Sequence, residues 1–146
     1  MTKPKLESVA KVLVVNDSNE VLILTIGEYK AHPEKSFTPD LPGGLVDPGE
    51  SELIAVRREL QEEAGIVLDE NAFTLAYAQT EYFEEKHKSV SKFLYVARVE
   101  GRPEVTISWE HASYEWAPIE KVLDGSIVMR PFYKEAIEYS VSVGLL

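Results

Sequence analysis

The sequence predicts an α/β fold, one layered domain in which helices cover a mixed β-sheet. Two observations predict it. Segments with strand composition alternate with turns over most of the chain, and helical segments follow the first two strands and the last one. A chain of 146 residues can bury one core without covalent cross-links, so residues 1–146 are expected to form a single domain.

Five segments are rich in the β-branched and aromatic residues that strands favour. The first two are joined by residues 16–19 (Asn-Asp-Ser-Asn), which are turn-forming, so this pair is expected to form a hairpin. The third and fourth are long and are joined by a charged turn, residues 84–88. The predicted strands are residues 9–15, 21–26, 73–83, 89–99 and 114–117.

The strongest helical segment is residues 51–64. Ser51 is a suitable N-cap, and Gly65 follows at the position where helices commonly end. Four apolar residues fall within roughly 80° around the helix axis, which predicts a face packed on the core. They are Leu53, Val56, Leu60 and Ala64. Two shorter helices are expected at 118–123 and 131–140, because a proline opens each of them.

The chain contains no cysteine and carries a formal net charge of −10. The lack of cysteine excludes disulfides, thiolate zinc sites and cysteine nucleophiles, and it is typical of a reducing compartment. So acidic a surface repels nucleic-acid backbones and anionic membranes, which argues against broad nucleic-acid binding. The first residues lack the apolar run of a secretory signal, and no stretch approaches the roughly 20 apolar residues of a membrane span. We therefore expect a cytoplasmic protein with no membrane partner.

Three glutamates of the predicted helix, Glu59, Glu62 and Glu63, share one face because they lie at positions i, i+3 and i+4. Carboxylates at this spacing repel one another, and protonation, nearby cations or a bound metal relieves the repulsion. Oxygen ligands without cysteine or nearby histidine favour Mg²⁺ or Mn²⁺ over zinc. The alternative is a solvated acidic helix face that binds nothing.

The segment 44–66, GLVDPGESELIAVRRELQEEAGI, contains these glutamates and resembles the Nudix box at every fixed position. A glycine-rich loop leads into a capped helix, as that motif requires. The order of the surrounding elements also resembles the Nudix (MutT-like) hydrolases over nearly the whole chain. The resemblance therefore implies a Nudix-type α/β/α sandwich. The fixed positions are Gly44, Glu50, Arg58, Glu59, Leu60, Glu62, Glu63, Gly65 and Ile66.

In that family, glutamates equivalent to Glu59, Glu62 and Glu63 bind or serve metal ions, and the carbonyl equivalent to Gly43 often completes the ligands. The resemblance implies a pyrophosphohydrolase that uses Mg²⁺ or Mn²⁺ to activate water for attack on a phosphoanhydride. It also implies a supporting role for four positions. Two of them, Arg58 and Glu50, form a pair that orients the helix and its loop. These positions are Gly44, Glu50, Arg58 and Gly65.

A second segment, residues 109–116, resembles the region before the last strand of many Nudix enzymes. A glutamate there approaches the metals from the side opposite the box, so Glu110 is expected to be an additional metal ligand or general base. The alternative is an exposed loop glutamate. The water's proton could go to Glu59, Glu62 or Glu110, and the sequence favours Glu59. His111 is expected to contact the substrate, with a structural histidine as the alternative.

Residues outside the box select the substrate in this family. Tyr82 lies close to the position of a tyrosine in diadenosine polyphosphate enzymes, and residues 79–82 lack the proline typical of ADP-ribose enzymes. This favours a nucleoside triphosphate or dinucleoside polyphosphate, although Tyr82 could be an ordinary strand aromatic. Residues 27–40 are predicted to form a polar surface loop, whose Lys30, His32 or Lys35 could contact phosphate. Other cationic candidates are Lys86, Lys88 and Lys92, and the alternative is that each of these is a solvated side chain.

Two functions from other classes are alternatives to the hydrolase. One is a non-catalytic Nudix domain that senses a nucleotide or docks a protein, but such domains typically have a broken box. The other is an isomerase of the same fold, but that branch uses a cysteine and a longer chain. A homodimer is also compatible with the sequence.

Overall fold

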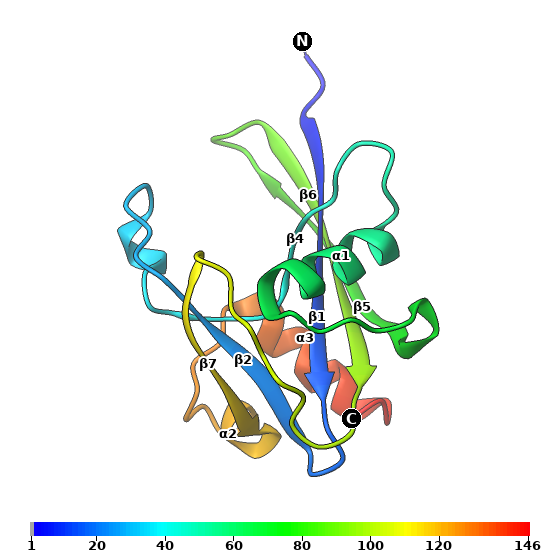
Figure 1. Cartoon of the computed structure of the whole chain (residues 1–146). Coiled ribbons are helices and arrows are strands. Elements are labelled where there is room, and N and C mark those ends of the chain that lie inside the picture. Colours follow the sequence, from blue (N-terminus) through cyan, green and yellow to red (C-terminus); the bar gives the residue numbers. More distant parts are fainter. Residues whose placement is uncertain (1) are drawn as a thin grey trace.

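A mixed sheet of seven strands forms the middle layer of the computed structural model, which describes residues 2–146 (Figure 1). The strand order is β3-β2-β1-β6-β5, with β4 paired to β1 and β7 paired to β2. The strands are β1 (Lys5–Val15), β2 (Glu20–Ile26), β3 (Pro39–Asp40), β4 (Gly43–Leu45), β5 (Phe73–Phe83), β6 (Lys88–Arg98) and β7 (His111–Pro118).

Helices cover both faces of this sheet, as Figure 1 shows. The helix α1 (Glu52–Ala64) packs on one face, and α2 (Ile119–Leu123) and α3 (Pro131–Ser142) pack on the other. Two short 3-10 helices, η1 (Pro33–Lys35) and η2 (Glu70–Ala72), lie in the connections. The predicted α/β/α sandwich with a mixed sheet is therefore confirmed.

The central strand β1 serves both layers through the alternation of its side chains. Val12 and Val14 belong to the core beneath α1, whereas Leu13 and Val15 belong to the core beneath α3. Such a strand is apolar on both faces, which is why the run VLVV appears in the sequence. Lys11 follows the same alternation and points to the α3 side, where it meets other polar groups.

The predicted hairpin of the first two strands is only partly formed. β1 and β2 share one register pair, Val15 with Val21, directly beside the turn. β1 instead pairs in parallel with β6 along its whole length, and β2 pairs with β7. Turn chemistry reports where the chain reverses, but the partner of a strand depends on distant segments.

Most of the other predicted elements are confirmed within a few residues. Strand β5 has the bounds predicted for the third strand segment, and α1 begins directly after Ser51. Strand β7 is longer than predicted because it starts at His111. The loop 27–40 contains η1 and ends in β3, so it is more ordered than expected. Among residues 2–146, no helix combines the length and hydropathy that a membrane span needs.

Candidate functional site

The box helix α1 is fixed at both ends by local contacts. The Ser51 hydroxyl accepts a hydrogen bond from the Ile54 N–H at 3.2 Å, which satisfies one of the free donors of the first turn. Gly65 ends the helix in the left-handed conformation, with φ of 70°. These two contacts set the bounds of the helix, and with them the direction in which its three glutamates project.

Arg58 gathers three glutamates around one guanidinium. Its Nε and Nη2 donate to the two carboxylate oxygens of Glu50 at 2.8 and 3.0 Å, a bidentate pair. Its Nη1 donates to Glu59 and to Glu62, both at 3.2 Å. The hydrogen bond from Arg58 lowers the pKa of Glu50 to about 2. Arg58 and Glu50 thus tie the loop to the helix, and Arg58 offsets the repulsion between two glutamates.

Two glycines allow the loop to lie against its neighbours. At Gly43, with φ of 136°, a Cβ atom would lie 2.1 Å from the Ala10 carbonyl oxygen, a distance that no side chain can adopt. At Gly44, a Cβ would lie 3.0 Å from Oε1 of Glu59. The double glycine therefore lets β4 pair closely with β1 and leaves room for the Glu59 carboxylate.

Glu63 is buried at the end of α1 that faces this loop. Its Oε2 accepts the Gly43 N–H at 3.0 Å. Burial raises the pKa of Glu63 to about 7, and burial also raises the pKa of Glu59 above its usual range. Glu62, by contrast, is 57% exposed and meets Arg58 at the surface.

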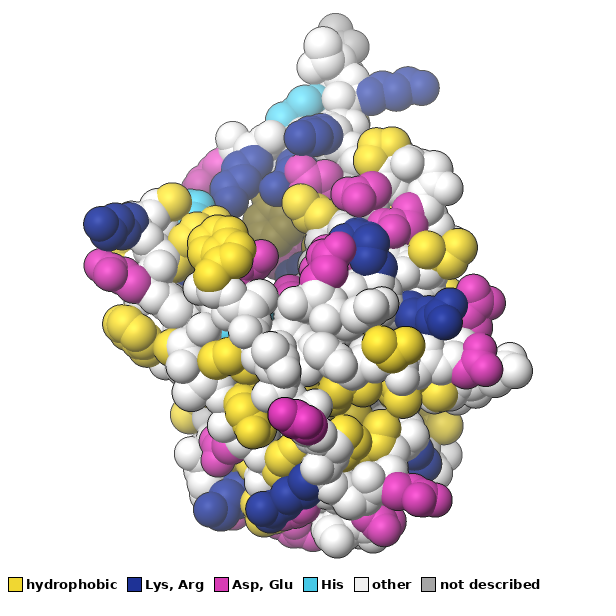
Figure 2. All heavy atoms as spheres, in the orientation of Figure 1, with side chains coloured by type: hydrophobic (Ala, Val, Ile, Leu, Met, Phe, Trp, Pro, Cys, Tyr) yellow, Lys and Arg dark blue, Asp and Glu magenta, His cyan; other side chains and the backbone are white. Residues whose placement is uncertain are grey.

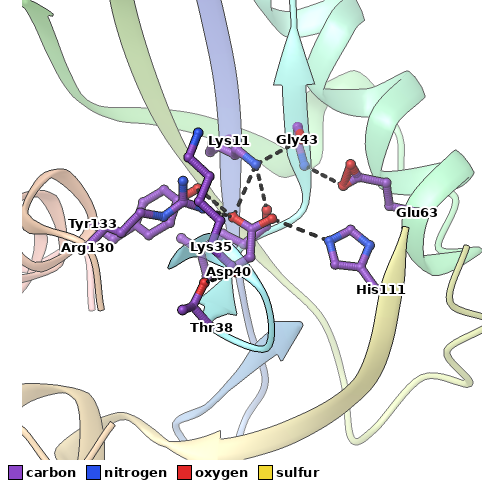
Figure 3. A network of polar contacts seen from close by, with 10 residues as sticks. Lys11, Lys35, Thr38, Asp40, Gly43, Glu63, His111, Arg130 and Tyr133 are labelled. Atoms are coloured by element: carbon purple, nitrogen blue, oxygen red, sulfur yellow. Dashed lines mark hydrogen bonds and ion pairs between the residues drawn. The ribbon is translucent and has the colours of Figure 1, made fainter. Parts of the chain in front are cut away.

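The Gly43 carbonyl accepts a hydrogen bond from a buried lysine. Lys11 Nζ lies 3.0 Å from this oxygen, 3.1 Å from the Leu41 carbonyl and 3.3 Å from Oδ1 of Asp40 (Figure 3). Three acceptors match the three protons of an ammonium group, so Lys11 is fully satisfied although its side chain is only 12% exposed. Its pKa stays above the usual lysine range, since the attraction of nearby groups, including Asp40 and Glu63, outweighs burial.

Asp40 is the centre of this network. Besides Lys11, its Oδ1 accepts from Arg130 Nη2 and from the Tyr133 hydroxyl, both at 2.7 Å. Its Oδ2 lies 3.3 Å from Nε2 of His111. Burial alone would favour the neutral acid, but these donors hold the pKa of Asp40 well below its usual range. Figure 3 shows Asp40 between α3 on one side and the Gly43–Glu63 contact on the other.

A cavity of about 710 Å³ lies beside this network, on the α3 side of the sheet. Figure 2 shows a hollow in the upper part of the molecule, bordered by basic and acidic side chains. Six basic residues line the cavity against three acidic ones, in a chain whose net charge is −10. The basic residues are Lys11, Lys35, Lys86, Lys88, Lys92 and Arg130, and the acidic residues are Glu7, Glu81 and Glu135.

Some of these cations are paired with the acidic residues of the wall. Lys88 lies 3.4 Å from Glu7, and Lys92 lies 3.0 Å from Glu81. Lys35 has no acidic partner within 4.0 Å among residues 2–146. Its pKa is lowered first by burial and then by nearby cations, Arg130 above all. The cavity therefore holds crowded positive charge that an anion would relieve.

The structure brings some of the expected substrate residues to this cavity and not others. Lys35 lines it, whereas Lys30 is exposed elsewhere on the loop. Tyr82 is half-exposed, lies outside the cavity wall and bonds through its hydroxyl to His87 at 3.2 Å. The side chain of His111 is 3% exposed and faces Asp40, which favours the structural alternative for this histidine.

Glu110 is exposed on the turn before β7. Its backbone carbonyl accepts the Gly27 N–H at 2.9 Å, which fixes the turn against the start of loop 27–40. The Ser108 N–H donates to the Glu63 carbonyl at 3.2 Å, so the same turn is tied to the end of α1. The backbone of this turn thus lies close to the box helix.

The chemistry of the box side chains fits a hard divalent cation. Glu59, Glu62 and Glu63 offer only oxygen donors, and burial of two of them disfavours their charged forms unless a cation is near. In the arrangement described, however, Arg58 and the Gly43 N–H engage these carboxylates. Consequently no group of three acidic or histidine side chains converges on one point within residues 2–146.

Four residues of this site were missed by sequence reasoning: Lys11, Asp40, Arg130 and Tyr133. Lys11 had a detectable signal, because it is a single charge within an apolar strand segment and must find a partner if that strand is buried. Asp40 directly precedes the Leu-Pro-Gly-Gly turn, and a polar residue there could have been added to the candidates. Arg130 and Tyr133 gave no signal beyond the start of a helix.

Both the fold and the glutamate-bearing loop and helix are those of a Nudix-type hydrolase. The model of the NUDIX domain matches residues 5–136, so this chain belongs to the Nudix family. Members of this family generally use divalent metal ions. The family predicted from the box is therefore confirmed, as is the enzyme class, a pyrophosphohydrolase.

Among curated proteins, an asymmetrical bis(5'-nucleosyl)-tetraphosphatase of Caenorhabditis elegans is 32% identical over 93 residues, which cover 64% of this chain and 66% of the relative. A putative 8-oxo-dGTP diphosphatase of Bacillus subtilis is 30% identical over 109 residues, 73% of this chain and 63% of the relative. The matched segments thus span slightly less than two thirds of the length of each of these two relatives.

Among solved structures, a MutT protein from Methanosarcina mazei Go1 superposes with a TM-score of 0.78 and 26% identity, covering 97% of this chain and 98% of the other. An Ap4A hydrolase of C. elegans superposes with a TM-score of 0.71 and 24% identity, covering 94% and 96%. The second similarity shows the fold alone. Together they confirm the α/β architecture over nearly the whole chain.

Proposed function

We propose that this chain hydrolyses a phosphoanhydride bond within a nucleoside triphosphate or a dinucleoside polyphosphate, with Mg²⁺ or Mn²⁺ held by Glu59, Glu62 and Glu63. One observation carries the choice of a polyphosphate. The box helix contacts Gly43 through Glu63, Gly43 contacts Lys11, and Lys11 lines a cavity rich in cations. The relatives named as a bis(5'-nucleosyl)-tetraphosphatase and a putative 8-oxo-dGTP diphosphatase agree with such a substrate.

The chain's residues divide the work by charge. The cavity lysines and Arg130 would hold the non-reacting phosphates, which an acidic surface would otherwise repel. A divalent ion, when bound, would lower the pKa of water and offset the charge that develops on phosphate oxygens. Arg58 keeps Glu59 and Glu62 in place from beside the helix, and it does not need to reach the substrate.

The proton of the attacking water would pass to a glutamate of the box. Burial raises the pKa of both Glu59 and Glu63, which moves these carboxyls toward the range of an effective general base. Glu59, which the sequence favoured, therefore stays a candidate and Glu63 joins it. Glu110 remains a proposed additional ligand or base, since its turn is tied to α1 and to loop 27–40.

The test is hydrolysis of a nucleotide panel in Mg²⁺, with products identified by mass and run in ¹⁸O water to locate the attacked phosphorus. We expect Glu62→Gln and Glu63→Gln to lower turnover by orders of magnitude while the chain stays folded. Glu52→Gln, at the other end of the same helix, is the matched control and should keep its turnover.

Mg²⁺-independent hydrolysis that survives both box substitutions would reject the proposed function. Tight nucleotide binding without any product would support the non-catalytic alternative instead. The cytoplasmic location, the single domain over residues 1–146 and the homodimer stay predictions from the sequence.

A further inference from the structure

One nitrogen of the Arg130 guanidinium is held in place by two hydrogen bonds. Nη2 donates to Oδ1 of Asp40 at 2.7 Å and lies 3.3 Å from the Tyr133 hydroxyl. The group also lies over the Tyr133 ring, 5.0 Å from its centroid. These contacts fix both the position and the plane of the guanidinium, although the side chain as a whole is 42% exposed.

The guanidinium has two further nitrogens besides Nη2. Within residues 2–146, the hydrogen bonds of Arg130 side-chain nitrogens all involve Nη2, which leaves Nε and Nη1 without a protein acceptor. Arg130 belongs to the cavity wall, together with Lys35 and Lys86. Both two-donor forks of a guanidinium include Nη2, which Asp40 and Tyr133 engage, so the free nitrogens offer separate donors. The terminal Nη1, held in place through its neighbour, can donate to one phosphate oxygen.

The anchor itself cannot swing freely. Asp40 is buried, and three further donors hold it, namely Lys11, His111 and the Tyr133 hydroxyl. The carboxylate is charged over the physiological range, because these donors keep its pKa low. Asp40 is therefore a fixed acceptor for Arg130. Its negative charge, however, lies beside a cavity that would bind an anion, so charge alone does not explain its place there.

We propose that Arg130 binds a phosphate group of the substrate through its free Nη1 nitrogen, and that Asp40 and Tyr133 are positioning residues that hold the guanidinium in that orientation. The inference rests on the proposed function for the identity of the ligand, a polyphosphate. Arg130 sits on the opposite side of Asp40 from the Glu63 contact, as Figure 3 shows, so it would hold a phosphate away from the box carboxylates.

The two possible roles of Asp40, as a charge and as a positioning residue, predict opposite changes in polyanion affinity for Asp40→Asn. If the cavity only collects positive charge, Asp40→Asn removes a negative charge near it and strengthens the binding of a polyanion. If Asp40 positions Arg130, the same substitution frees the guanidinium and weakens binding, although every cation of the cavity remains. Asp40→Asn therefore separates the two explanations.

The experiment is calorimetric titration of the full chain with inorganic tripolyphosphate in EDTA, so that neither a metal nor turnover is needed. We expect Arg130→Met to weaken binding about tenfold or more, and Arg130→Lys to recover only part of this loss, since it restores the charge but not the planar group that Asp40 and Tyr133 hold in place. Asp40→Asn should weaken binding by several fold. Arg102→Met and Arg102→Lys, at an exposed arginine paired with Glu20, are the matched controls and should bind like the unchanged chain.

Thermal unfolding of each variant separates a local effect from a loss of fold. If Asp40→Asn does not fold, Tyr133→Phe removes a single hydroxyl from the same anchor and should still weaken binding. Unchanged affinity in Arg130→Met, or equal or tighter binding in the anchor variant that folds, would overturn the proposal. Arg130-dependent tripolyphosphate binding in a chain that hydrolyses no nucleotide would uphold it while rejecting the proposed function.

Discussion

Burial makes Glu63 an unusual carboxyl group. Its pKa in the folded chain is about 7, against 4.5 for an ordinary glutamate carboxyl. The native state therefore binds more protons than the unfolded state between about pH 4.5 and 7, and stability falls as the pH rises through this interval. Over this interval the free energy of unfolding falls by an amount on the order of 3 kcal/mol.

This titration gives a prediction for the metal-free chain. Glu63→Gln removes the ionisable group but keeps an oxygen that can accept the Gly43 N–H, so stability should vary less between pH 5 and 7 than in the unchanged chain. Urea unfolding in EDTA at several pH values measures it, with the exposed Glu62→Gln as control. Equal pH slopes in the Glu63 and Glu62 variants would show that Glu63 does not titrate in this range.

At the scale of single residues, sequence reasoning found the groups that a short motif contains. The three glutamates share one face because the periodicity of a helix fixes the neighbours on its surface. The Arg58–Glu50 pair, which the resemblance to the motif implied, joins the helix to the loop before it. The network around Asp40 was missed because its members come from β1, β3, β7 and α3. Only the folded sheet brings those elements together, and no local pattern reports it.

At the scale of elements, α1 was well predicted and β1 was not. The helix has a cap, an apolar stripe and a terminating glycine, all within 15 residues. The strand shows its composition but not its partners, and its main partner is parallel, so a crossover rather than a turn connects them. For this reason the predicted hairpin formed only beside its turn.

The N-cap of α1 offers a prediction at this scale. Ser51→Ala removes the acceptor for the Ile54 N–H and should lower the free energy of unfolding by about 1 kcal/mol. Ser51→Asp keeps an acceptor at the same position and should retain most of the stability. The urea midpoint of the two variants decides it, and an unchanged midpoint for Ser51→Ala would mean that packing alone sets the start of the helix.

At the scale of the whole molecule, charge is unevenly divided. The chain is strongly acidic, yet basic residues predominate in one cavity. Salt screens the repulsion among the acidic groups of the chain, which stabilises the fold. Salt also screens the attraction between the cavity cations and an anion, which weakens binding. Raising NaCl from about 20 to 300 mM should increase the unfolding temperature and weaken tripolyphosphate binding.

Differential scanning calorimetry and titration calorimetry at each salt concentration measure the two effects separately. Arg130→Met should have a smaller salt dependence of binding, because one charged contact is already absent. Tripolyphosphate affinity that does not change with salt would mean that the cavity cations do not reach the anion.

The parallel pairing of β1 with β6 also governs how the chain is made. Lys5 pairs with Lys88 and Val15 with Arg98, so the middle strand of the sheet is synthesised long before the strand that lies beside it. On the ribosome, an apolar N-terminal segment must wait, unpaired along most of its length, until about two thirds of the protein has emerged. During that interval the nascent chain exposes an open strand edge, a place where strands can pair wrongly with other chains.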